Sequence, residues 1–300
     1  MQIEYSKRIN SLPPYLFVEI DRLKRDAKAK GADIISLGIG DPDMASPDFV
    51  VDAMCKAVKN SANHHYPTDD GMPEFRASVV DYLKRRFNVV IDRDKEVLPL
   101  LGSKDGIGHI HIAFVNPGDV VLVPDPGYPV YNSGTVFTGG ETVYMPLLEK
   151  NNFLPDFSKV PEEKLKKAKL LFLNYPNNPT AACATREFFK QVIELANKYN
   201  IIVCHDNAYS EVHFGKEKPL SFLSLPGAKE VGIEYYSLSK TYNMTGWRVG
   251  FAVGNEQVLK GLAKAKSNLD SGVFQATQLA GKAALDNGDD FIKNNCKEYE

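Results

Sequence analysis

Residues 236–250, YSLSKTYNMTGWRVG, combine one lysine with two serines just before it and an arginine eight residues after it. The hydroxyls of Ser237 and Ser239 and the guanidinium of Arg248 could hold a phosphate, while Lys240 offers an amine. A neighbouring cation and partial desolvation lower the pKa of a lysine, which favours the neutral amine that attacks an aldehyde. The stretch predicts a site for pyridoxal phosphate, a phosphate-bearing aldehyde. Taken alone, it is equally typical of a surface lysine among polar loop residues.

The composition is that of an ordinary globular protein that acts on small molecules. Hydrophobic residues make up 43% of the 300 positions, and the formal net charge is -2. This balance gives no electrostatic footprint for nucleic acid or an anionic membrane. The four cysteines lie far apart without a C-x-x-C pair, which fits a reducing compartment. Because the sequence shows neither a signal peptide nor a membrane-spanning apolar run, we predict a cytoplasmic protein that enters no membrane.

Short, nearly continuous apolar runs alternate with segments of helix length. The runs cover residues 97–101, 120–123, 170–173, 201–204 and 250–253. Such runs are typical of parallel strands with helices on both faces of the sheet, so we predict an α/β fold. Helices are predicted over residues 15–30, 46–58 and 72–86, and a short strand from residue 34 is predicted to enter a glycine turn at Gly40.

Four of the predicted strands are followed by residues that suit a bound ligand, and ligands of open α/β sheets bind at the carboxyl ends of strands. Residues 102–106, GSKDG, open a helix whose N–H groups and Ser103 hydroxyl favour a phosphate, although a simple N-cap is the alternative. The proline-rich turn at 124–131 could present Tyr128 to a flat ring, although packing is the commoner role. Residues 174–180 place side-chain amides in a turn.

Asp206 follows the apolar run at 201–204. A buried acid is costly unless it is paired, and a protonated pyridine nitrogen would be a suitable partner. At about 4 Å and an effective dielectric near 20, the pair would be worth roughly 4 kcal/mol, or about three pKa units. Tyr209, three residues later, could donate a hydrogen bond to the phenolate oxygen of the same ring.

Other classes of site lack their central motif. The six histidines show no ligand spacing such as H-E-x-x-H, so no metal site is predicted. The sequence has neither a G-x-S-x-G elbow nor a P-loop. Pro42 and Asp43 follow Gly40 where a dinucleotide fingerprint needs a helix and a third glycine, which excludes that loop.

Taken together, these residues resemble those of the fold-type I pyridoxal-phosphate enzymes, specifically the class I/II aminotransferases. The resemblance covers almost the whole chain and rests on the ordered set Gly40, Tyr66, Gly102-Ser103-Lys104, Pro126-Gly127-Tyr128-Pro129, Asn177-Asn178-Pro179-Thr180, Asp206 with Tyr209, Ser237-x-Ser239-Lys240, and Arg248. It implies a three-layer αβα fold with a mostly parallel central sheet, like the large domain of aspartate aminotransferase. It also implies an arm and part of a small domain at 1–45, a large domain at 46–285, and the start of a connecting helix at 286–300.

The resemblance implies a role for each candidate residue. Lys240 would form the internal aldimine and move the proton in a 1,3-proton transfer, and Asp206 would pair with the pyridine nitrogen. Tyr209 and Asn178 would contact the ring oxygen, and Tyr128 would stack on the ring. The residues implied around the phosphate are Ser103, Lys104, Ser237, Ser239 and Arg248, with Tyr66 reaching the phosphate of the neighbouring subunit in a homodimer.

Within this group, residues 12–17, 37–43, 98–104 and 123–131 most resemble the LL-diaminopimelate aminotransferases. The implied reaction moves an amino group between LL-diaminopimelate and 2-oxoglutarate in lysine and cell-wall biosynthesis. The implied substrate contacts are Tyr15, Gly40, Lys104, Tyr128 and Asn178. Two alternatives stay open: a pyridoxal-phosphate lyase on the same scaffold, acting by C–S cleavage or ring closure, and a cofactor-binding or dimer-forming module without turnover.

One departure from the family pattern concerns the substrate's α-carboxylate. In the family, an arginine well beyond the lysine binds this group, whereas Arg248 is the last arginine of this sequence. We therefore expect a fragment that lacks most of the small domain, with a nearly complete cofactor site and an incomplete substrate site.

Overall fold

The computed structural model describes residues 1–300 except positions 15, 39 and 216. Tyr15, a predicted substrate contact, therefore lies outside the described residues. Among the described residues, no helix is both long and apolar enough to cross a lipid bilayer.

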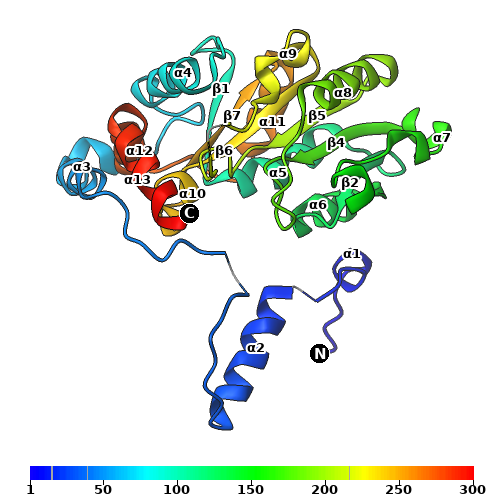
Figure 1. The fold of residues 1–300 in the computed structure, drawn as a ribbon, viewed down its shortest axis with the longest axis horizontal. Helices are drawn as coiled ribbons and strands as arrows, with labels where there is room; N and C mark the ends of the chain where they lie inside the picture. The colour runs from blue at the N-terminus through cyan, green and yellow to red at the C-terminus, as the bar shows by residue number, and fades with distance from the viewer. Residues whose placement is uncertain (15, 39, 216) are drawn as a thin grey trace.

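A seven-stranded sheet forms the centre of the molecule (Figure 1). Its strands are β1 (Val97–Leu100), β2 (Val120–Asp125), β3 (Glu141–Pro146), β4 (Ala168–Asn174), β5 (Ile202–Asp206), β6 (Gly232–Ser237) and β7 (Gly250–Gly254). They lie in the order β1-β7-β6-β5-β4-β2-β3. The pairs β3–β2, β2–β4, β4–β5 and β5–β6 are parallel, and β7 is antiparallel to both of its neighbours, β1 and β6. The predicted mostly parallel sheet is confirmed.

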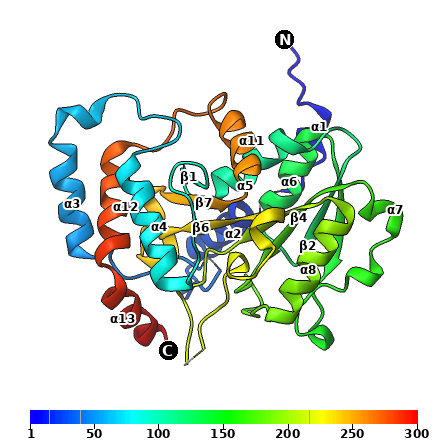
Figure 2. The same cartoon turned by 90° about the horizontal axis from the view of Figure 1, so that it is seen from above.

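Helices cover both faces of this sheet, as Figures 1 and 2 show. Those with residues in the two buried clusters include α4 (Pro73–Phe87), α8 (Arg186–Tyr199) and α12 (Gln275–Asn287) on one face, and α5 (Ser103–Phe114), α6 (Pro129–Thr138) and α11 (Glu256–Lys266) on the other. Neighbouring residues of β2 alternate between the clusters, because successive side chains of a strand point to opposite faces. The remaining helices are α1 (Lys7–Asn10), α2 (Leu16–Ala29), α3 (Asp48–Val58), α7 (Glu162–Leu165), α9 (Ala228–Val231), α10 (Leu238–Thr241) and α13 (Asp289–Tyr299). The three-layer arrangement is confirmed.

The N-terminal segment stands apart from the sheet, with α2 projecting below the body in Figure 1. The helix predicted over residues 15–30 corresponds to α2. The strand predicted from residue 34 is wrong, because described residues 32–38 contain no strand. Ile35 and Leu37 are 88% and 94% exposed, so this apolar segment has no packed face and no neighbouring strand to form a ladder with.

Candidate active site

The strand ends that carry several of the predicted site residues lie at one edge of the sheet. Asn174 and Asp206 are register partners at the ends of parallel β4 and β5. Ser237 ends β6 and pairs with Gly250, the first residue of β7, which also pairs with Leu100 at the end of β1. Because β7 runs in the opposite direction, its beginning lies beside the ends of its neighbours. Segments that are distant in the sequence are thus brought to the same edge.

Lys240 lies on α10, the short helix that follows β6. The Ser237 side chain caps this helix, and its Oγ accepts a hydrogen bond from the Ser239 N–H at 3.2 Å. Lys240 Nζ donates to the Gly40 carbonyl oxygen at 2.6 Å and lies 4.0 Å from Asp41 Oδ1. Burial lowers the pKa of Lys240; the Asp41 carboxylate opposes this shift and Arg248 adds to it. The neutral amine of Lys240 is therefore easier to form than that of a lysine in water.

The beginning of α5 and Arg248 form a cradle suited to an anion. No side chain caps this helix at its N-cap residue Gly102, whose φ is 82°. Arg248 Nη2 donates to the Leu101 carbonyl oxygen at 3.3 Å. The positive φ favours glycine at position 102, and a Cβ there would lie 2.7 Å from that nitrogen, so the guanidinium would have to move away. The first N–H groups of the helix, from Ser103 on, and the arginine together favour a phosphate.

Asp206 is buried, and one of its oxygen atoms lacks a protein partner. Oδ2 accepts a hydrogen bond from the Tyr131 hydroxyl at 2.8 Å. Oδ1 has no hydrogen-bond partner among the described residues. Burial raises the pKa of Asp206 to about 6, opposed by the Tyr131 hydroxyl, the charge of His205 and the backbone N–H of Ala208. An unsatisfied buried carboxylate oxygen is costly, so the site is prepared for a cationic partner.

The predicted ring contacts lie around this carboxylate. Asn178 Nδ2 donates to the Tyr209 hydroxyl at 3.3 Å. The Tyr128 ring packs edge-on against Tyr131, with centroids 5.9 Å apart. Sequence analysis missed Tyr131 as a site residue. The available signal was its place one helical turn after Tyr128, on the same face of α6.

A cavity of about 1030 Å³ adjoins the cradle, and its lining includes Lys104, Tyr128 and Arg248 but neither Lys240 nor Asp206. The Leu12–Pro14 segment of the N-terminal arm closes part of it. Tyr66 is 87% exposed, so its predicted contact with a second subunit has an accessible side chain.

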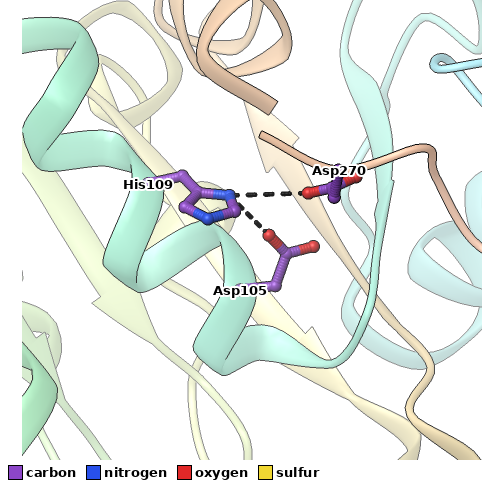
Figure 3. A group of neighbouring side chains, drawn as sticks. All are labelled: Asp105, His109 and Asp270. Atoms are coloured by element: carbon purple, nitrogen blue, oxygen red, sulfur yellow. Dashed lines mark ion pairs between the residues drawn. The ribbon is translucent and has the colours of Figure 1, made fainter. Parts of the chain in front are cut away.

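Asp105, His109 and Asp270 form a group near this cavity, and Figure 3 shows the histidine facing both carboxylates. His109 Nδ1 lies 2.7 Å from Asp105 Oδ1 and 3.7 Å from Asp270 Oδ2. The buried Lys266 Nζ lies 2.6 Å from Asp105 Oδ2 and 2.9 Å from Asp270 Oδ2. Since the Lys266 ammonium lies within bonding distance of both carboxylates, the group is an ion-pair network. Asp105 Oδ2 also accepts the Leu101 N–H at 2.8 Å, which connects this network to the cradle.

Comparison with known proteins identifies the family. The family described as aminotransferase class I and II matches residues 32–300. The chain belongs to this family of aminotransferases. A relative of this aminotransferase, the LL-diaminopimelate aminotransferase of Aquifex aeolicus (strain VF5), is 55% identical over 282 residues, which cover 94% of this chain and 73% of the relative.

Solved structures confirm the fold of the aminotransferase. The substrate-bound BacF of Bacillus subtilis is 38% identical with a TM-score of 0.95, over 100% of this chain and 75% of BacF. A double mutant of Thermus thermophilus aspartate aminotransferase is 25% identical with a TM-score of 0.91, over 99% of this chain and 78% of that one. Because this family and fold use pyridoxal phosphate, the predicted cofactor is confirmed.

The residues of this aminotransferase fit the cofactor. The unpartnered Oδ1 of buried Asp206 suits the cationic ring nitrogen. The beginning of α5 and Arg248 suit the phosphate, and Lys240 supplies the amine. These three features suit three different groups of one molecule.

Asp206→Asn is expected to change how the stability of the cofactor-free protein depends on pH. The pKa of Asp206 in the folded protein, about 6, exceeds the pKa of a solvent-exposed aspartate, 3.8. Between these values the unfolded chain loses its proton first, so wild-type stability falls as pH rises. Asparagine does not titrate, so its contribution to stability does not fall with pH. The free energy of unfolding of the variant, relative to that of wild type, should therefore rise by on the order of 2 to 3 kcal/mol between about pH 4 and about pH 7. Urea denaturation at both pH values measures this gain; a pH-independent difference would contradict the shifted carboxyl.

Proposed function

We propose that this aminotransferase moves an amino group between LL-diaminopimelate and 2-oxoglutarate, in lysine and cell-wall biosynthesis. The observation that carries this proposal is the identity to relatives of that name. Besides the Aquifex aeolicus protein, the relative from Desulforudis audaxviator (strain MP104C) is 53% identical over 299 residues. The lyase alternative is not favoured, because these relatives are aminotransferases.

We assign the chemical steps to residues of the chain as follows. When bound, pyridoxal phosphate supplies an electron sink for negative charge at the substrate α-carbon. Lys240 Nζ takes and returns the proton at that carbon, and its lowered pKa suits this task. Asp206 Oδ1 holds the proton on the ring nitrogen. Tyr209 and Asn178, joined by their hydrogen bond, orient the ring oxygen.

The remaining residues bind and orient. Ser103, Ser237, Ser239 and Arg248 would hold the phosphate, with Lys104 beside them, and Tyr128 would pack on the ring. Gly40 and Lys104 also contact the substrate. Support comes from the Lys240–Gly40 hydrogen bond and from the place of Lys104 in the cavity wall.

We also propose a homodimer in which Tyr66 reaches the phosphate of the second subunit, supported by the exposure of its ring. The domain division at residues 45 and 285 and the cytoplasmic location stay predictions from the sequence.

Donor preference tests the proposed reaction. With 2-oxoglutarate as acceptor and the cofactor-loaded protein, we expect kcat/KM for LL-diaminopimelate to exceed the values for aspartate, alanine and phenylalanine by at least about a hundredfold, because unmatched polar groups penalise the wrong donor. Glutamate formation is measured. Equal values would contradict the proposed donor, and release of pyruvate or ammonia without a keto acid would indicate a lyase. Cofactor binding without any turnover would favour a binding module.

A further inference from the structure

A fully buried histidine and glutamate lie behind Asp206. His205 precedes Asp206 on β5, so its side chain points to the opposite face of the sheet. There its ring packs edge-on against Phe189 of α8, with centroids 5.2 Å apart. Glu234 is its register partner on β6, and both side chains are 0% exposed. The pair lies on the two strands that carry Asp206 and, at the end of β6, Ser237.

Hydrogen-bond partners determine the charge of His205. Its Nε2 lies 3.0 Å from the Tyr175 carbonyl oxygen, which can only accept, so Nε2 carries a proton. Its Nδ1 lies 2.7 Å from Glu234 Oε1. If Glu234 is ionised, both ring nitrogens are donors and His205 is an imidazolium.

Glu234 has the partners that an ionised carboxylate needs. Oε2 accepts from the Ser221 hydroxyl at 2.6 Å and from the Tyr236 hydroxyl at 2.8 Å. Oε1 accepts from the Phe222 N–H at 2.6 Å as well as from His205. A carboxylate with several donors is stabilised in its charged form, and the imidazolium balances its charge. The pair is therefore a buried ion pair.

His111 shows what burial does to a histidine without such a partner. It is also 0% exposed, and its ring nitrogens face the carbonyl oxygens of Gly108 and Tyr131, at 3.3 and 3.1 Å. Burial lowers the pKa of His111 to about 4, so this ring is neutral near pH 7. The carboxylate of Glu234 is the feature that distinguishes His205.

The charge of His205 acts on Asp206. The titratable groups that interact with Asp206 are His205, its neighbour on β5 with the side chain on the other face of the sheet, Tyr131 on α6, Tyr209 after β5 and Tyr235 on β6. The three tyrosines are neutral near pH 7 since their pKa values are raised, first by burial. His205 is the one cation of the four, and it favours the ionised Asp206 against the opposing effect of burial.

We propose that His205, kept charged by Glu234, is a positioning residue that holds Asp206 in its ionised form, ready for the cationic ring nitrogen of the cofactor. His205 and Glu234 act through Asp206 and contact neither cofactor nor substrate. The inference rests on the pairing of Asp206 with the ring nitrogen that is part of the proposed function.

Nitrogen NMR of the full chain labelled with ¹⁵N-histidine tests the charge state directly. At about pH 7.5, we expect both ring nitrogens of His205 to show protonated resonances and His111 to show one protonated and one bare nitrogen. His205→Gln and His111→Gln assign the two sets of signals. A bare nitrogen on His205 would overturn the proposal. This measurement needs neither bound cofactor nor a Glu234 variant that folds.

The ring nitrogen of the cofactor gives the second readout. With ¹⁵N-labelled pyridoxal phosphate bound, wild type should show a protonated ring nitrogen, and Glu234→Gln should shift it toward the bare form. The kcat of this variant should fall on the order of tenfold, the effect of about one pKa unit, with the donor KM nearly unchanged. Ser221→Ala, which removes a neutral donor from Glu234, should keep the wild-type signal.

The outcomes separate the two proposals. A ring nitrogen that is protonated in wild type and stays protonated in Glu234→Gln overturns the role of His205 and leaves the proposed function intact. A bare ring nitrogen in cofactor-loaded wild type contradicts the proposed role of Asp206 instead.

Discussion

Lys240→Ala is expected to lose amino transfer by about a thousandfold or more, because the variant has neither the nucleophilic amine nor a base at that position. The structure places the amine on α10, just after the end of β6 and next to Gly40, and burial lowers the pKa of this amine. Steady-state kinetics with LL-diaminopimelate and 2-oxoglutarate measure the loss.

Two control variants separate chemistry from charge and from fold. Lys240→Arg keeps a cation but has no amine that is neutral near pH 7, so it should lose as much activity as the alanine variant. Lys260→Ala removes an exposed lysine of α11 and should leave the activity unchanged. Borohydride reduction followed by peptide mapping should place the pyridoxyl group on Lys240 in wild type. Labelling of another lysine, or an active Lys240→Arg, would contradict this assignment.

The sequence predicted the strands that contain a continuous apolar run and missed two others, β3 and β6. β3 is an edge strand paired only with β2, and several of its side chains are exposed, so it has no continuous apolar run. β6 is buried along its whole length but carries Glu234 at its centre. In a sequence, a charged residue argues against a buried strand unless its hydrogen-bond and ion-pair partners are known. Those partners come from β5 and from residues 221 and 222, and this information is not local.

Site residues could be predicted from the sequence where they follow a predicted strand, because ligands of open α/β sheets bind at the carboxyl ends of strands. Ser103 and Asp206 each follow an apolar run of the sequence, and the sheet brings the ends of these runs to one edge, whereas Ser237 was predicted from its place before Lys240. Tyr131 and His205 escaped because their roles depend on contacts across the sheet. The sequence alone does not show that the Tyr131 hydroxyl reaches Asp206, or that both nitrogens of His205 face acceptors. Residue type and position were enough to predict the residues proposed to contact the cofactor. The residues that set the charge state of Asp206 could be found only in the structure.

Lys266→Met is expected to destabilise the protein by about 3 to 5 kcal/mol, the cost of removing one partner from a buried ion pair. Lys266 is 1% exposed, and its Nζ bonds Asp105 at 2.6 Å and Asp270 at 2.9 Å. Without the ammonium, two nearby carboxylates with little access to water would repel each other. Urea denaturation near pH 7 measures the change in the free energy of unfolding.

A matched lysine and a double variant test the reason for this loss. Lys260, on the same helix, pairs with Glu256 at 2.6 Å but is 62% exposed, so Lys260→Met should leave stability nearly unchanged. If the cost comes from the unbalanced carboxylates, adding Asp270→Asn to Lys266→Met should recover part of the stability, because the two changes are coupled through one network. Equal stability of the Lys266 and Lys260 variants would contradict the buried network. Since Asp105 also accepts the Leu101 N–H, a loosened network should weaken cofactor binding at the beginning of α5 as well.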